Sequence, residues 1–122
     1  MKETVYWTWF IIAGIVLFFL SGLHMAIVHL DGLLGIFNPA GPVSITWDNV
    51  FFRNQSLFFM FTYLIILAAG LYHGFYGLRT ILFELGLKKK TQRFVNIFFW
   101  VIGIALFVFG SYAALAAKTM KI

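Results

Sequence analysis

The 122-residue chain contains no cysteine and only two prolines. The absence of cysteine excludes thiol catalysis, thiolate-bound zinc, iron–sulfur ligation and disulfides within this chain. It also excludes covalent haem attachment through a Cys-x-x-Cys-His motif, so any haem would be held by coordination and packing alone.

Charged residues are also scarce: they make up 11% of the chain, against 62% hydrophobic residues that include 16 Phe. With a mean hydropathy of +0.95, a domain of this size cannot hide its apolar surface from water, because small domains leave much of their area exposed. The composition therefore predicts an integral membrane protein. The net charge of +5 fits membrane flanks and does not indicate a nucleic-acid partner.

Three uncharged runs divide the sequence: Tyr6–Leu30, Asn54–Leu78 and Phe94–Ala117. Each exceeds the roughly 20 residues that a helix needs to cross a bilayer. We expect an all-α fold with one membrane domain over residues 1–122 and transmembrane helices at about 6–30, 54–80 and 94–117. The first run is far longer than the apolar core of a signal peptide, so we expect no cleavage there.

The two connections between these runs differ in character. The first, from Asp31 to Arg53, contains five glycines and prolines that break regular helices. The second, Leu87–Arg93, is short and basic, suited to anionic lipid or to an extrinsic partner. An N-terminus on the cytoplasmic side places most Lys and Arg inside. The inner set is Lys2, Arg79, Lys88, Lys89, Lys90 and Arg93, and the outer set is Arg53, Lys118 and Lys121.

Ionisable groups within membrane spans are costly and often functional, and His73 is the first candidate here. The small residues near it at helical offsets of three and four share its face; they are Ala69, Gly70, Gly74 and Gly77. A flat macrocycle needs such a groove beside a ligand imidazole. The alternative is close helix–helix approach, with His73 bonded across the interface. Arg79, nearly two turns further on, favours the macrocycle, since its guanidinium suits a propionate, although it also fits an ordinary basic flank.

The second candidate is His24, which follows Ser21 by one turn and shares a face with Gly14. His29 points about 140° away on an α-helix and adjoins Asp31, so it is the second choice as a ligand. The expected depths of His24 and His73 differ by roughly 20 Å. Two imidazoles on one iron need donor nitrogens about 4 Å apart. If both are ligands, they belong to two haems, each completed by another chain.

The segment LYHGFYGLR at positions 71–79, followed by Glu84 and Gly86, resembles the cytochrome b anchors of the succinate dehydrogenase and fumarate reductase superfamily. The family pattern is a ligand His, Gly four residues on, Arg two residues later, and then an acidic residue shortly before Gly. Glu84 stands where the family usually has Asp. The segment SGLHM at 21–25, with Gly14 before it, resembles the first-helix ligand segment of the dihaem anchors.

This resemblance implies His73 as axial ligand of an inner haem b, His24 as ligand of an outer haem b, and Arg79 as a propionate partner. Ser21, Gly70, Gly74 and Gly77 would border the cofactors. Three helices, where many dihaem anchors have five, imply half of a multi-helix haem-binding bundle. A second anchor chain, a flavoprotein and an iron–sulfur subunit would complete it. The implied role is electron transfer to ubiquinone or menaquinone, with no succinate chemistry in this chain.

Quinone residues are harder to place from the sequence. Trp47 and Asp48, in the first connection, are candidates to stack on a quinol and take its proton, or they form an interfacial anchor. The expected location is the prokaryotic plasma membrane, with the mitochondrial inner membrane as the alternative. Two further functions stay open: a haem-free anchor or assembly scaffold, and the cytochrome b subunit of another respiratory complex.

Overall fold

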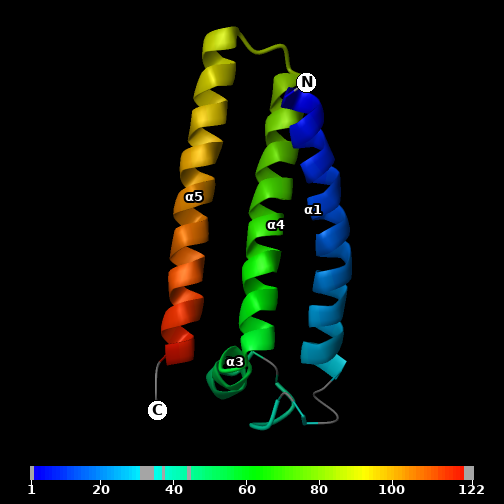
Figure 1. The fold of residues 1–122 in the computed structure, drawn as a ribbon, viewed down its shortest axis with the longest axis vertical. Coiled ribbons are helices and arrows are strands. Elements are labelled where there is room, and N and C mark those ends of the chain that lie inside the picture. The colour runs from blue at the N-terminus through cyan, green and yellow to red at the C-terminus, as the bar shows by residue number, and fades with distance from the viewer. Residues whose placement is uncertain (1, 31–34, 37, 44, 120–122) are drawn as a thin grey trace.

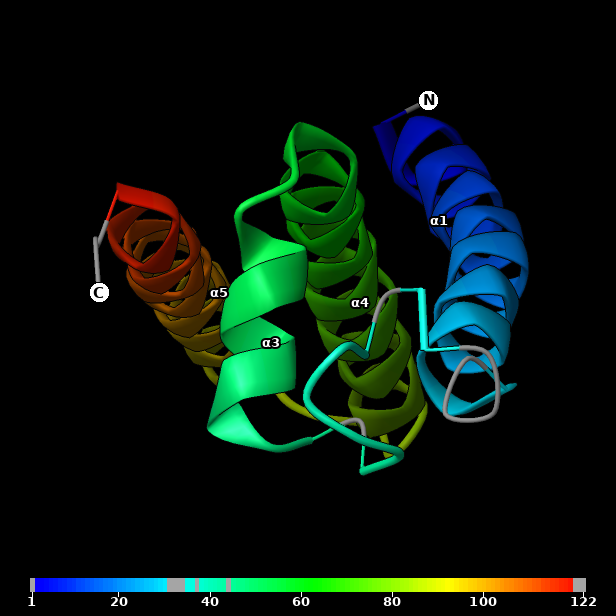
Figure 2. The ribbon, with the colours of Figure 1, turned by 90° about the horizontal axis from the view of Figure 1, so that it is seen from below.

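The computed structural model describes residues 2–30, 35–36, 38–43 and 45–119. Its helices are α1 (Lys2–Met25), the π-helix η1 (Ala26–Leu30), α3 (Trp47–Asn54), α4 (Leu57–Phe83) and α5 (Lys89–Thr119). The described chain contains no strand, which confirms the all-α prediction. The three long helices stand side by side, with α4 between α1 and α5 and packed against both (Figures 1 and 2).

Three helical segments are long and apolar enough to cross a membrane: Lys2–Leu30, Leu57–Phe83 and Lys89–Thr119. The predicted order and number of spans are therefore confirmed. None of the residues of α5 is buried within the described chain, and large apolar side chains lie exposed along α1 as well. Such surfaces suit lipid or neighbouring membrane helices, because nothing in water would compensate their exposure.

The observed helix boundaries differ from the predicted ones. The middle helix begins at Leu57 and ends at Phe83, three residues later at each end than expected. Gly86 then adopts a φ of +76°, a left-handed conformation that glycine takes without strain. The basic segment 89–93 was wrongly placed in the connection, because α5 already begins at Lys89. Lys, Gln and Arg are good helix formers, so nothing stops the helix from extending past the apolar run.

The first connection contains an unexpected helix, α3, which packs against α4 and α5 (Figure 2). Its Asn49 is 0% exposed and holds the preceding loop. The Asn49 side chain accepts a hydrogen bond from the Ala40 amide at 2.9 Å and donates to the Gly41 and Val43 carbonyls at 3.0 and 2.9 Å. These bonds satisfy backbone groups of a loop without regular secondary structure, which would otherwise need hydrogen bonds to water.

The end of the first span is π-helical from Ala26 to Leu30. The α-helical angle used to separate His29 from His24 therefore does not apply, because a π-turn contains more residues. His29 is exposed at this end. Asp31, expected beside it, lies outside the described residues, as does Lys121.

The basic residues fall into two sets, one at each end of the bundle. The N-terminus and the α4–α5 connection lie at one end in Figure 1, and α3 and the C-terminus at the other. The predicted inner set of cations therefore shares one end. Arg53, expected as a simple flank, is only 3% exposed at the opposite end. Its guanidinium donates to Asn38 and, at 3.3 Å, to the Tyr63 hydroxyl.

Candidate functional site

His73 lies against α1. Its Nδ1 is 2.9 Å from the Phe10 carbonyl oxygen, and its ring stacks on the Phe10 ring at 4.1 Å with an interplanar angle of 1°. A Cβ added to Gly14 would lie 2.8 Å from His73 Cε1, so glycine is what allows this close approach. Because a carbonyl only accepts, Nδ1 is the donor in this bond.

The other small residues near His73 divide into two groups. Gly70 faces Leu17, and Gly77 faces Phe10, at 3.8 and 3.1 Å from an added Cβ. Helix α1 therefore fills the part of the face that these two glycines share with the imidazole, as the helix-approach alternative expected. Gly74 differs, because nothing lies within 4 Å of its added Cβ. The open space beside this helix turn is at Gly74.

The residues at His73 fit an axial haem ligand. Ligand histidines usually donate their second ring N–H to a carbonyl or carboxylate, which fixes the tautomer and orients the ring. The bond to Phe10 supplies that feature, and the exposed Gly74 places no side chain beside this turn of α4. No three His, Asp or Glu residues of the described chain gather at one point. Haem does not require such a cluster, since axial ligation needs one side chain on each face of the ring.

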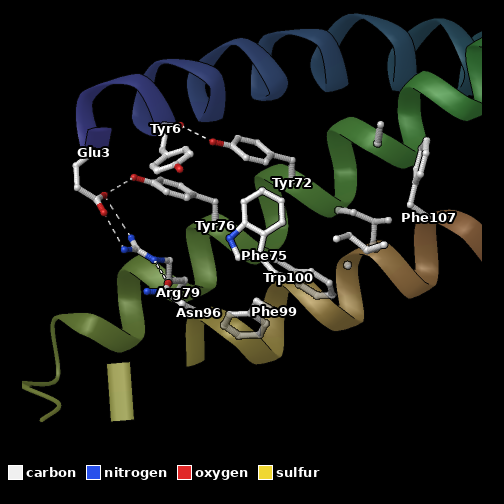
Figure 3. A pocket seen from close by; sticks show the side chains of 14 residues that line it. Glu3, Tyr6, Tyr72, Phe75, Tyr76, Arg79, Asn96, Phe99, Trp100 and Phe107 are labelled. Atoms are coloured by element: carbon white, nitrogen blue, oxygen red, sulfur yellow. Dashed lines mark hydrogen bonds and ion pairs between the residues drawn. The ribbon is translucent and has the colours of Figure 1, made fainter. Parts of the chain in front are cut away.

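Arg79 lies in a polar cluster at the N-terminal end of α1 (Figure 3). Its guanidinium contacts the Glu3 carboxylate at 2.8 Å, and its Nε donates to Asn96 Oδ1 at 2.6 Å. Tyr76 donates to the same carboxylate at 3.0 Å, and the Phe83 ring lies 4.2 Å from the guanidinium carbon. The carboxylate paired with Arg79 here is that of Glu3. A propionate would have to share the guanidinium with it.

His24 lies near the other end of the bundle. Its ring meets Tyr63 edge-on at 5.2 Å, and Tyr63 in turn accepts the hydrogen bond from Arg53. His24 Nδ1 is buried without a hydrogen-bond partner in the described chain. Ser21, one turn earlier, is half-buried. A buried ring nitrogen with no partner is uncommon in a folded protein and marks a position where a ligand or another chain would compensate it.

The two histidines occupy different depths. His73 contacts α1 at Gly14, ten residues before His24, and His24 contacts α4 at Tyr63, ten residues before His73. At ~1.5 Å per residue the imidazoles are roughly 15 Å apart along the bundle. This is less than expected, because α4 runs three residues later than predicted and places His73 nearer its middle. One iron still cannot bind both.

Trp47 and Asp48 lie on the exposed surface of α3, with Trp47 61% exposed. Trp47 packs only loosely on Phe51, with ring centroids 6.1 Å apart. The structure places both residues at the end of the bundle opposite Arg79 (Figure 1). Neither residue lines a cavity at the Arg79 end of the bundle.

A cavity of about 440 Å³ lies between α4 and α5, beside the N-terminal turns of α1 (Figure 3). Its walls are largely aromatic, including Tyr72, Phe75, Phe99 and Trp100, and the Arg79 cluster closes one end. This volume is in the range of small-molecule sites. Along α4 the cavity extends from Arg79 to Ala68, about 16 Å of helix and close to half of the span.

The sequence did not indicate Glu3, Asn96 or Phe10 as residues of the candidate site. Phe10 contacts His73 through its backbone carbonyl and its ring, and one Phe among 16 gives no signal of either contact. Asn96 did have one: it is a polar residue in an apolar run, followed at helical offsets by Phe99, Trp100, Gly103 and Phe107. That spacing defines one helical face, and all of these residues line the cavity. Glu3 lies three residues before the first apolar run, where an acidic residue gives no signal of a site.

Comparisons with protein families, with characterised proteins and with solved structures found no match to this chain.

Proposed function

We propose that this chain is a haem b-binding membrane anchor subunit of a succinate:quinone or fumarate:quinone oxidoreductase. It would carry electrons between an iron–sulfur subunit and membrane quinone. The proposal rests on the resemblance of segment 71–79 to that family and on the surroundings of His73. The companion chains, the plasma-membrane location and the cytoplasmic N-terminus belong to the same proposal.

The observation that carries the proposal is the bond between His73 and Phe10. A carbonyl at 2.9 Å accepts from Nδ1, and that bond leaves Nε2 as the ring nitrogen for a metal. An imidazole in a membrane span whose other nitrogen is already bonded has the arrangement usual for metal-ligand histidines. The stacked Phe10 ring fixes the plane of the imidazole. These two contacts with Phe10 support a ligand role for His73, because they hold the imidazole in one orientation.

His73 would hold the inner haem and His24 the outer one, each together with a residue of a partner chain. A haem iron held by two imidazoles supplies one-electron transfer and leaves no coordination position for a substrate. In this chain, α1 positions the imidazole of His73 through Phe10 and Gly14, while Gly74 leaves space beside it. Arg79 lies with Glu3 and Asn96 at the end of the bundle that holds the N-terminus.

A second candidate is a haem-free anchor or assembly scaffold. The same contacts also support this function. His73 packs against Gly14, and α1 covers Gly70 and Gly77, as in a helix–helix interface without a cofactor. Polar side chains bonded between membrane helices stabilise their association without any cofactor. The scaffold function predicts a colourless complex that still needs His73 for packing.

Single leucine substitutions in the purified complex separate these functions. His73→Leu should remove one b-type haem and leave the other, because the two imidazoles lie about 15 Å apart. His24→Leu should remove the second haem, and His29→Leu serves as the matched control, with both haems kept. The measurement is the reduced-minus-oxidised spectrum with a pyridine haemochrome count. Loss of the second haem only in His29→Leu would exchange the roles of His24 and His29. Unchanged haem content in all three variants would refute the ligand roles.

A further inference from the structure

Helix α3 buries polar side chains and exposes aromatic ones, the reverse of a surface helix in a water-soluble protein. Its buried residues are Asn49, Arg53 and Asn54, whereas Trp47 and Phe52 are 61% and 47% exposed. Arginine and asparagine are mostly exposed in folded proteins. Apolar side chains clustered on a surface mark a contact with a membrane or with another protein. The outward face of α3 therefore requires an apolar environment.

Hydrogen bonds fix which face of α3 points inward. Asn49 holds the loop before the helix, and Arg53 donates to the Asn38 side chain. The side-chain amide of Asn54 donates to the Ala114 carbonyl at 3.2 Å. A rotation of α3 that hid its aromatic side chains would break these bonds and leave polar groups without partners. The polar face therefore determines where the aromatic face points.

Helix α3 lies at the level where the apolar run of α5 ends. Gln55, the residue after α3, donates from its side chain to the Ala117 carbonyl at 2.8 Å. The Gln55 carbonyl accepts from Lys118 Nζ, also at 2.8 Å. Ala117 ends the apolar run and Lys118 is the first cation beyond it, as is usual where a span reaches the boundary between hydrocarbon and water. At this level α3 lies across the end of the bundle (Figures 1 and 2).

Two features favour lipid over a protein partner on the outward face of α3. The first is continuity with the second span, because that span begins at Leu57, where Leu57 and Phe58 are exposed as well. The bilayer around the start of this span is therefore adjacent to α3. The second feature is Asp48, which is exposed beside Trp47. A protein interface would bury this carboxylate at a cost, whereas the head-group layer keeps it hydrated.

From these features we propose that α3 is an interfacial membrane anchor, with Trp47 inserted where lipid head groups meet acyl chains. Phe51, four residues later, shares the face of Trp47, and the two ring centroids are 6.1 Å apart. Interfacial helices bury their apolar side about 5–10 Å into this layer. Tryptophan is enriched there because its ring is apolar but carries one polar N–H. The inference does not depend on haem or quinone binding, and it assigns to Trp47 the anchor role, one of the two expected from the sequence.

The first test uses the full chain in phosphatidylcholine nanodiscs. Trp7→Phe, Trp9→Phe and Trp100→Phe together leave Trp47 as the only tryptophan. Lipid brominated near the glycerol end of its acyl chains should quench the Trp47 fluorescence, and by more than lipid brominated near the chain ends. Acrylamide in the water should quench Trp47 several-fold less than it quenches N-acetyltryptophanamide. The matched control carries Trp47→Phe and keeps Trp100 alone, which brominated lipid should quench because Trp100 lies exposed within a span.

The second test places the photo-crosslinker benzoylphenylalanine at the position of Trp47 in the assembled complex, in its own membrane. Illumination should attach a phospholipid there, measured as a mass increase of the chain. A crosslink to another polypeptide would overturn the proposal in favour of a docking surface for a partner subunit. The absence of any crosslink would also overturn it, as would Trp47 fluorescence that acrylamide quenches fully and brominated lipid does not, because the face would then meet water. Neither test measures haem, so this proposal and the proposed function can fail separately.

Discussion

At the scale of single residues, the contact of His73 with α1 is the feature on which the candidate site depends. Three groups of α1 define it: the Phe10 carbonyl, the Phe10 ring and the missing side chain of Gly14. Each acts on a different property of the imidazole, namely its tautomer, its plane and its distance from the neighbouring helix. A change at any of them should alter His73 without touching it directly.

Gly14→Ala tests this arrangement. The added Cβ would lie 2.8 Å from His73 Cε1, so the imidazole must move or the helices must separate. Overpacking of this kind costs about 1–3 kcal/mol, and we expect a lower thermal midpoint in detergent together with weaker haem binding. Gly22→Ala is the matched control on the same helix, because nothing lies within 4 Å of its added Cβ. Equal effects in both variants would contradict the account.

The sequence indicated His73 as a candidate but not the groups of α1 that contact it. Helical offsets place Gly70, Gly74 and Gly77 relative to His73 on their own helix, because one backbone fixes all of them. The sequence does not contain the rotation of α1 about its axis, which decides that Gly70 and Gly77 meet α1 while Gly74 stays open. That rotation follows from packing between segments some sixty residues apart.

At the scale of secondary-structure elements, the spans were predictable and the connection was not. Long apolar runs identify transmembrane helices because the bilayer demands a minimum length. Helix α3 has only eight residues, which is too short to be stable alone, and it forms against α4 and α5. Its buried residues are Asn49, Arg53 and Asn54. The first two fell in the expected connection and Asn54 at the start of the expected second span, where nothing in the sequence marked them as buried.

Asn49→Ala should loosen the first connection. The substitution removes the three hydrogen bonds that join Asn49 to the Ala40 amide and to the Gly41 and Val43 carbonyls, each of which contributes about 0.5–1.5 kcal/mol. We expect faster hydrogen exchange and proteolysis within residues 38–43. Asp48→Ala, at the exposed neighbouring position, is the control and should leave both rates unchanged. Equal protection of the loop in Asn49→Ala would show that its bonds do not hold it.

At the scale of the whole molecule, the bundle is a flat array in which α4 alone packs on both sides (Figure 2). Two imidazoles at different depths, one of them with a buried unpartnered nitrogen at His24, and an α5 without a buried residue are features expected of one part of a larger assembly. The proposed companion anchor chain would cover such surfaces and supply the missing axial ligands.

The absence of cysteine makes the topology directly measurable. Single cysteines at Lys90, in the first turn of α5, and at Ile45, before α3, report the two ends of the bundle. With the N-terminus cytoplasmic, a membrane-impermeant maleimide added to intact cells should label the Ile45→Cys variant, and the Lys90→Cys variant only after the cells are opened. The reverse pattern would contradict the orientation inferred from the basic residues.

The most direct test of the central claim is the haem content of the intact purified complex. The account predicts a low-spin reduced b-type spectrum and a pyridine haemochrome value of two haems per complex, one at the depth of His73 and one at the depth of His24. A complex that contains this chain in stoichiometric amount but gives a negative haemochrome test would contradict it.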